Sequence, residues 1–155
     1  MVTTWYTRKS RRNRPVCLVV RKENKVDKQQ IRDMWVNALE SGEYEQGRLV
    51  LHQKVNGKEK FCCLGVLCDL YVENVGDIGV YFDDVTGNYH YGGEIRVLPD
   101  KVMDWAGLYN RTGDGVLDGK NVGVPLSVLN DTYRSTFKEI AQAIKEAEHL
   151  FISDS

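Results

Sequence analysis

The sequence predicts an α+β fold, and three observations lead to this class. Residues 60–71 form the most apolar stretch and carry apolar side chains at helical spacing. The pair Asn56-Gly57 and other turn signals separate short runs typical of antiparallel strands. Further helical patterns flank the apolar stretch on both sides. We therefore expect a small antiparallel sheet, or hairpins, packed on about three main helices around a central cysteine-rich helix.

Length and charge divide the chain into an arm and one domain. A chain of 155 residues is long enough for a single domain with one hydrophobic core. Residues 1–28 carry nine Lys or Arg side chains against two acidic ones, a net charge of +7, which leaves −8 for residues 29–155 because the total is −1. We expect residues 1–25 to form a basic N-terminal arm with a strand at 16–20, and residues 26–155 to form a single α+β domain.

Composition argues against several classes of protein. Hydrophobic residues (42%) and charged residues (28%) are at globular levels. No apolar run approaches the roughly 20 residues needed to span a bilayer, and the Arg-rich N-terminus lacks the apolar core of a signal peptide. The four cysteines form no recognisable disulfide framework. We therefore expect no membrane association and a reducing cytoplasm.

Before the central helix, the chain predicts one helix and one hairpin. Asp27 can cap a helix over about 28–41. Residues 48–53 and 58–62 are expected to pair across the asparagine-glycine turn. If the stretch before that turn is a strand, its alternation predicts one face for the polar residues and the opposite face for two leucines. The polar set is Tyr44, Gln46, Arg48 and His52, and the leucines are Leu49 and Leu51.

After the central helix, glycines and prolines mark shorter elements. We expect, in order, a second hairpin at 80–82 and 88–91, a short helix opened by Leu98-Pro99-Asp100 and stopped by Gly107, a loop or short hairpin at 110–124, a helical turn from Pro125 to Asn130-Asp131, and a final amphipathic helix at 136–149. Thr136 and Glu139 predict a capping box for the last helix. The pair Asn130-Asp131 is a further candidate for its cap.

The central helix has two faces that predict different roles. The apolar stripe consists of Cys63, Val66, Leu67 and Leu70. The neighbouring face consists of Cys62, Gly65 and Asp69. A glycine inside a helix costs roughly 1 kcal/mol relative to alanine, so we expect another element to approach closely there. The cysteines are small buried hydrophobes in one interpretation. In the other, Cys62 or Cys63 is a thiolate whose pKa is lowered by the helix N-terminus.

Familiar cofactor and metal motifs are absent from the sequence. The glycine-rich segments lack the spacing of a phosphate-binding loop and of a calcium loop. Cys62, Cys63 and Cys68 are not spaced like zinc ligands. We therefore expect no cofactor and no metal site.

One enzymatic constellation is retained as an alternative. A cysteine at a helix start, with His52 or His90 elsewhere, is the minimum for a cysteine-dependent hydrolase. The Cys-x-Gly-Val pattern is weakly similar to the nucleophile helix of NlpC/P60-type cysteine peptidases. It departs from that family in having a second cysteine beside the first and a leucine in place of the usual serine.

Four blocks in the chain resemble a set of small uncharacterised proteins encoded by tailed bacteriophages. The blocks are Trp35-x-x-Ala38-Leu39-x-Ser41-Gly42-x-Tyr44-x-Gln46-Gly47, then Phe61-Cys62-Cys63-Leu64-Gly65-Val66-Leu67-Cys68-Asp69-Leu70, then Leu98-Pro99 with Trp105-x-Gly107-Leu108, and finally Leu129-Asn130-Asp131 before Phe137-x-x-Ile140-Ala141. The resemblance covers about residues 30–147 and leaves out the basic arm. It implies a viral protein in the cytoplasm of an infected bacterial host, and it implies no particular activity.

Polar and aromatic residues in and near these blocks predict a binding site. The candidate ligand-binding residues are Tyr44, Gln46, Arg48, Cys62, Asp69, Asn130 and Asp131. Aromatic groups with a few convergent polar groups are typical of a small-ligand pocket. In the alternative interpretation, Gln46 and Asn130 satisfy backbone groups. No catalytic residue is assigned.

The function predicted from these observations is binding. We expect a phage accessory protein, active in host takeover or against host defence, that binds a host protein or a small nucleotide-type signalling ligand. One alternative is the cysteine-dependent hydrolase. Another is a nucleic-acid-binding or virion-associated protein that uses residues 8–28, because clustered basic residues favour contact with phosphates. The oligomeric state is not predicted.

Overall fold

The computed structural model describes residues 27–108, 110–117 and 121–146. The basic arm, with its predicted strand at 16–20, lies outside the described residues. The helices are α1 (Lys28–Glu40), α2 (Cys63–Asn74), α3 (Asp100–Ala106), α4 (Leu126–Asp131) and α5 (Phe137–Glu146). The strands are β1 (Glu45–Gln46), β2 (His52–Val55), β3 (Lys58–Phe61), β4 (Val80–Asp83), β5 (Asn88–Tyr91), β6 (Asp114–Leu117) and β7 (Asn121–Pro125).

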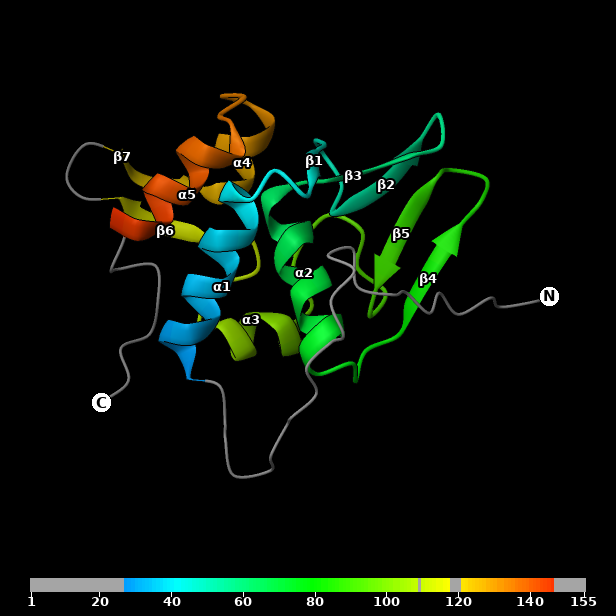
Figure 1. The fold of residues 1–155 in the computed structure, drawn as a ribbon, viewed down its shortest axis with the longest axis horizontal. Helices are drawn as coiled ribbons and strands as arrows, with labels where there is room; N and C mark the ends of the chain where they lie inside the picture. The colour runs from blue at the N-terminus through cyan, green and yellow to red at the C-terminus, as the bar shows by residue number, and fades with distance from the viewer. Residues whose placement is uncertain (1–26, 109, 118–120, 147–155) are drawn as a thin grey trace.

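Helix α2 lies at the centre of the fold (Figure 1). A five-stranded sheet lies on one side of it, in the order β1-β3-β2-β5-β4, and α1 lies on the other side. Strands β2 to β5 pair antiparallel, whereas the two-residue β1 runs parallel to β3. The second sheet is the β6–β7 hairpin, formed by the segment in which a loop or short hairpin was predicted. The predicted α+β class is therefore confirmed, with β1 as a parallel addition at the edge.

Helix α1 begins at the predicted capping residue. Asp27 Oδ1 accepts a hydrogen bond from Gln30 N at 2.8 Å, and Gln30 Oε1 accepts one from Asp27 N at 3.0 Å. This reciprocal pair satisfies two backbone donors that a helix start leaves open. Apolar residues on one face of α1, among them Ile31 and Trp35, are buried in the core. The local signals in the sequence are sufficient to place this helix.

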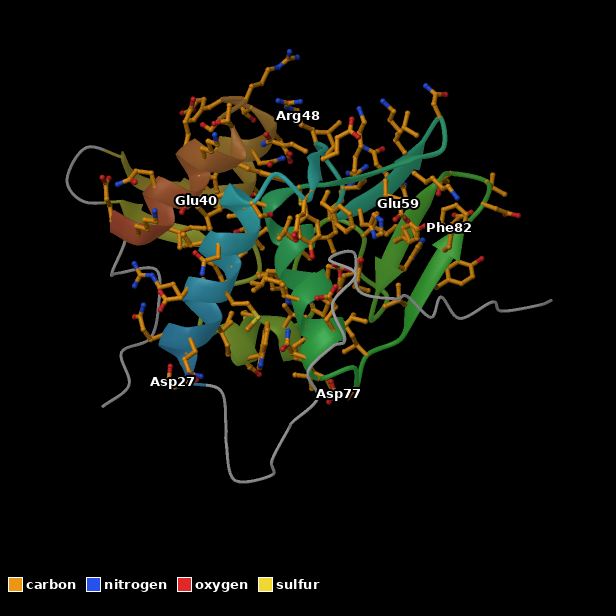
Figure 2. The ribbon with its side chains drawn as sticks, in the orientation of Figure 1. Asp27, Glu40, Arg48, Glu59, Asp77 and Phe82 are labelled. Atoms are coloured by element: carbon orange, nitrogen blue, oxygen red, sulfur yellow. The ribbon has the colours of Figure 1, made fainter. Side chains whose placement is uncertain are left out.

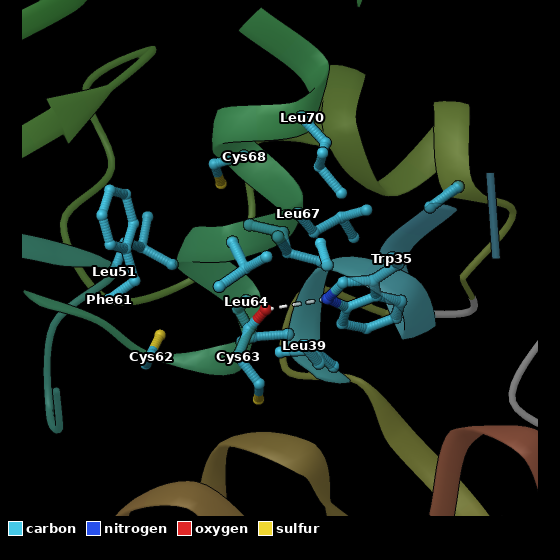
Figure 3. Packing of buried hydrophobic residues seen from close by; sticks show 14 of the residues in the cluster. Trp35, Leu39, Leu51, Phe61, Cys62, Cys63, Leu64, Leu67, Cys68 and Leu70 are labelled. Atoms are coloured by element: carbon cyan, nitrogen blue, oxygen red, sulfur yellow. Dashed lines mark hydrogen bonds between the residues drawn. The ribbon is translucent and has the colours of Figure 1, made fainter. Parts of the chain in front are cut away.

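Helix α2 is buried on every side along most of its length. The predicted apolar stripe of Cys63, Val66, Leu67 and Leu70 is fully buried, and the intervening residues are buried as well. Trp35 of α1 donates its indole N–H to the Cys63 carbonyl oxygen at 2.9 Å (Figure 3). The helix is therefore surrounded by its neighbours and does not present a polar face to solvent.

The glycine within α2 allows a backbone to approach closely, as predicted. A Cβ atom built on Gly65 would lie 1.6 Å from the carbonyl oxygen of Leu51. That same oxygen accepts a hydrogen bond from Cys62 N at 3.1 Å. The chain before β2 therefore packs directly on the first turn of α2, and only glycine leaves room for it.

The prediction of a continuous strand before the first hairpin is wrong. Strand β1 ends at Gln46 and β2 begins at His52. Between them Leu49 adopts φ +73°, which interrupts the alternation of an extended chain. As a result Leu51 is buried while Leu49 is exposed, and His52 is buried on the core side of β2. The two leucines do not share a face.

Helix α5 begins where its capping box predicts. Thr136 Oγ1 accepts a hydrogen bond from Glu139 N at 3.2 Å. The apolar face predicted for this helix is buried: Phe137, Ile140, Ala141 and Ile144. The suggestion that Asn130-Asp131 caps this helix is wrong, because both residues bond to the segment around β1 instead.

Candidate functional site

Two segments that are distant in the sequence are joined by side-chain hydrogen bonds, and we call their contact the junction. They are residues 46–49 and residues 130–135. Gln46 Nε2 donates to Asn130 Oδ1 at 2.9 Å and to the Ser135 carbonyl oxygen at 2.8 Å. Since one amide group holds both the end of α4 and the chain after it, the glutamine fixes the position of the second segment.

Asn130 is the buried centre of the junction. Its Nδ2 donates to the Gly47 carbonyl oxygen at 2.9 Å, and its Oδ1 also accepts from Cys63 N at 3.3 Å. The asparagine therefore connects β1, the first turn of α2 and α4. A buried amide with these bonds is satisfied and holds the three elements together. This is the structural role that the sequence analysis retained as an alternative for Gln46 and Asn130.

Asp131 fixes the backbone of Leu49. One carboxylate oxygen, Oδ1, accepts from Leu49 N at 2.9 Å and from Asn130 Nδ2 at 2.8 Å. Leu49 lies in the left-handed region, which costs a residue with a Cβ about 1–2 kcal/mol. Arg134, on the other segment, is likewise left-handed at φ +55°. The junction thus contains two non-glycine residues in a conformation that usually favours glycine.

Four side chains form the outer surface of the junction, and we call them the junction surface: Arg48, Leu49, Tyr133 and Arg134. Leu49 is 67% exposed and Tyr133 is 62% exposed, although both are large and apolar in most of their area. The guanidinium groups of the two arginines make no hydrogen bond or ion pair with any described residue, and Arg48 Nε is buried without a partner. Arg48 lies where the chain after β1 meets the end of the molecule that carries α4 (Figure 2).

The other predicted ligand-binding residues lie outside the junction surface. Tyr44 O–H donates to Asp69 Oδ2 at 2.6 Å, and both side chains are buried. Cys62 caps α2, and its sulfur accepts from Gly65 N at 3.4 Å. The structure therefore brings together Gln46, Asn130 and Asp131, with Arg48 beside them. It pairs Tyr44 with Asp69 as a separate internal contact.

The cysteines at the start of α2 are not activated thiols. Burial raises the pKa of Cys62 to about 12, and it raises the pKa of Cys63 and of Cys68 well above the ordinary value. The interpretation in which the helix N-terminus lowers this pKa is wrong. Removal of the sulfur from water disfavours the thiolate more than the backbone N–H groups of the first turn favour it.

The histidines considered for the hydrolase are held by other contacts. The His52 ring is stacked between Phe61 and Tyr89, at centroid distances of 3.8 and 3.7 Å. Its Nδ1 lies 2.8 Å from the Tyr91 hydroxyl. His90 packs edge-on against Tyr81 at 5.4 Å and is half-buried in β5. Both rings are thus held by neighbouring aromatic side chains.

The described parts of the chain hold no group of three or more His, Cys, Asp or Glu side chains arranged to bind a metal ion. They also contain no helix with the length and apolar character needed to cross a bilayer.

Sequence reasoning missed three of the four residues of the junction surface. Leu49 was expected on the strand face opposite to the polar residues, and Tyr133 and Arg134 lie in the short connection between two helices. A bulky aromatic residue in such a connection is a weak signal for an exposed site, since connections carry many binding residues. The left-handed backbone of Leu49 leaves no local signal, because the bond that holds it comes from Asp131.

The family model with the description "Domain of unknown function (DUF8296)" matches residues 27–148, well over half of the chain. The chain belongs to this family. Neither a curated protein nor a solved structure matches the chain. The DUF8296 match begins at Asp27, the cap of α1, and includes both segments of the junction. The junction is therefore part of the family's domain, and the basic arm lies before it.

Proposed function

We propose that this DUF8296 chain acts by binding a partner protein through the junction surface. The observation that carries the proposal is the position of Leu49, which is exposed, left-handed and held by Asp131. A surface turn with positive φ usually has glycine or asparagine, which adopt it with less strain. Strained residues that the surrounding structure holds in place occur preferentially at functional sites. A leucine that is 67% exposed buries only a minor part of its apolar surface in the fold itself.

The residue types of the junction surface favour a protein partner. Arg48 directly precedes the leucine, and Tyr133 and Arg134 follow Asp131, which holds the leucine backbone, by two and three residues. Tyr and Arg are enriched among the residues that dominate protein–protein binding energy. The base beneath them is rigid, because Gln46 and Asn130 join both segments. A surface that is ordered before binding loses less entropy when a partner docks.

A nucleotide-type ligand receives less support from the same residues. Tyr44 is bonded to Asp69, and Gln46 is bonded to Asn130. A ligand that used these polar groups would have to replace internal hydrogen bonds in buried positions, which is costly. We therefore propose a protein partner and keep the nucleotide as an outcome of the test.

The biological setting that we propose comes from the phage resemblance of the sequence blocks. In it, the chain is an accessory protein in the cytoplasm of an infected bacterium and acts in host takeover or against host defence. Three residues of the junction, Gln46, Asn130 and Asp131, belong to the blocks that carry this resemblance. The basic arm, proposed as an alternative contact for nucleic acid, has no part in this proposal.

Site-specific photo-crosslinking tests the proposal. A photoreactive phenylalanine derivative would replace Tyr133 in the chain expressed in bacterial cells, and the control would carry it at Val85. Val85 is 90% exposed and lies between β4 and β5, on the far side of the molecule from α4 (Figure 1). We expect one discrete protein adduct from position 133, absent from position 85 and lost when Leu49→Asp is added.

Three results would contradict the proposal. They are the absence of an adduct from position 133, the same adducts from both positions, or an adduct that Leu49→Asp leaves unchanged. Native mass spectrometry of the chain recovered from the same cells is the second measurement. A mass increment of nucleotide size in place of a protein adduct would support the ligand alternative instead.

A further inference from the structure

We infer that the segment of the partner that docks on the junction surface is acidic, with carboxylate groups that bind Arg48 and Arg134. This inference rests on the proposed function and adds the chemistry of the partner to it. The two guanidinium groups make no bond within the described chain. Arg111 shows the contrast, because it binds Asp100 at 2.8 Å and Glu94 at 3.3 Å. Apart from Arg48 Nε, which is buried, the guanidinium donors of the two arginines thus stay available for a partner.

The one carboxylate within the junction is already engaged. Asp131 Oδ1 accepts two hydrogen bonds, from Leu49 N and Asn130 Nδ2. It has no ion pair with either arginine. The acidic group of the junction therefore holds the backbone and leaves the positive charges of the junction surface uncompensated by a direct contact.

The positive charge of the junction surface contrasts with the net negative charge of the domain. Residues 29–155 carry a net charge of −8, since the total is −1 and residues 1–28 contribute +7. An acidic segment is repelled by such a domain in general and attracted at the place where two cations lie free. Charge complementarity of this kind selects the partner and its docking position more than it adds affinity.

The apolar side chains complete the match. Leu49 and Tyr133, the two exposed apolar residues of the junction surface, present apolar area that a purely electrostatic site would lack. An arginine forms two parallel hydrogen bonds with one carboxylate, which fixes the angle of approach. The segment that fits is therefore a short acidic stretch that also contains an apolar residue, displayed on the surface of a partner protein.

The crosslinked adduct from position 133 gives the direct test. After protease digestion, mass spectrometry sequences the peptide attached to the photoreactive residue. We expect several Asp or Glu residues close to the attachment site and an apolar residue among them. An attached peptide without this acidic cluster would overturn the inference. So would a peptide from the same chain or a second copy of it, or an adduct with nucleic acid.

Charge reversal provides the second readout and separates the two proposals. We expect Arg134→Glu to lower the adduct yield about tenfold, and Arg48→Gln to lower it in the same direction. The matched control is Arg96→Glu, because Arg96 is exposed and lies outside the junction, and its yield should not change. Thermal unfolding of each variant checks that the fold is retained. If Arg48→Gln is unstable, the test relies on Arg134→Glu, because Arg134 is exposed. If Arg134→Glu leaves the adduct yield unchanged, the acidic segment is refuted while the proposed function stays intact. If the chain with the photoreactive residue at position 133 and no other substitution forms no adduct, both proposals are refuted.

Discussion

Helix α2 and the junction surface show opposite relations between side chains and their surroundings. Around α2 the core is closed: residues 63–71 are buried, Trp35 donates to the Cys63 carbonyl, and Gly65 gives its space to the Leu51 backbone. On the junction surface, two large side chains are exposed and two guanidinium groups have no partner among the described residues. The first region stabilises the fold. The second contains left-handed residues that cost stability, and it presents apolar and charged side chains to solvent.

The residues that stand out in the sequence are not the ones that stand out in the structure. The cysteines are the most conspicuous residues of the sequence, and the structure makes them part of the packing. Leu49 is inconspicuous in the sequence, and its backbone conformation marks it as exceptional. Predictions on both regions can therefore separate residues that stabilise the fold from residues that bind.

The largest effect is expected for the reactivity of the thiols around α2. Because burial raises the pKa of Cys62 to about 12, its thiolate is roughly a thousandfold scarcer than that of an unperturbed cysteine at neutral pH. Native protein treated with iodoacetamide should be alkylated at least that much more slowly than protein in denaturant, followed by mass spectrometry. Rapid modification of one cysteine in the native state would return the hydrolase alternative to consideration.

The next largest effect is expected for Gly65→Ala. The added Cβ would meet the Leu51 carbonyl oxygen at 1.6 Å, so the backbone must move, and we expect a loss of about 3 kcal/mol or more in the free energy of unfolding. The control is Gly57→Ala, where a Cβ meets nothing within 4 Å. Its cost should stay near the left-handed penalty of about 1 kcal/mol, and equal losses from both variants in urea unfolding would disprove the close packing.

Asn130→Ala should have a smaller but clear effect on stability. The substitution leaves Gln46 Nε2, Cys63 N and the Gly47 carbonyl with one bond fewer each, and we expect a loss of about 2 kcal/mol. Asn37→Ala is the control, since Asn37 is exposed on α1 and alanine is a better helix former. A loss as small as that of the control would show that Asn130 does not hold the junction.

Leu49→Asn tests the contrast most directly. Asparagine tolerates the left-handed conformation better than leucine, so the free energy of unfolding should be unchanged or higher by up to about 1 kcal/mol. At the same time the variant removes the exposed apolar side chain and should weaken the adduct from position 133. If stability fell and binding persisted, Leu49 would be a structural residue. The junction surface would then no longer differ from α2 in its role.

The smallest effect is expected for Asp77, an exposed residue that follows α2. The hydrogen bond from the Tyr71 hydroxyl, together with Lys101, lowers the pKa of Asp77. A lowered pKa stabilises the fold above the unfolded value of about 4, and this contribution is lost as pH falls through the folded value. Asp77→Asn removes this contribution, so the difference in the free energy of unfolding between the variant and the unmodified chain should shrink as the pH falls. An unchanged difference across that range would show that the contact contributes nothing.

Elements with local signals were predicted well from the sequence. The Asp27 cap, the asparagine-glycine turn of the first hairpin and the Thr136 cap act over a few residues, so their pattern is visible without tertiary contacts. The close approach at Gly65 was predicted for the same reason, because an isolated glycine in a helix needs an explanation. These signals were enough for the fold class and for the order of the helices.

The candidate site was predicted only in part, because its geometry depends on distant residues. Gln46, Asn130 and Asp131 were selected as polar residues in the blocks, but the bonds from Gln46 to Asn130 and from Leu49 N to Asp131 join segments more than 80 residues apart. The conformation of Leu49 depends on that same contact. The direction of the Cys62 pKa shift depends on burial by elements that the helix start does not reveal. No local pattern contains this information.

The pairing of α1 with α5 has a consequence for synthesis of the chain. These are the first and last described helices, yet they lie side by side, with Arg32 donating to the Lys145 carbonyl at 3.1 Å and Lys145 Nζ 2.7 Å from Glu40 (Figure 1). A nascent chain therefore cannot cover this flank of α1 until α5 has left the ribosome. Contacts of such long sequence separation slow folding and leave apolar surface uncovered in the meantime. Chains whose translation halts before residue 137 should accordingly be bound by chaperones or degraded by proteases.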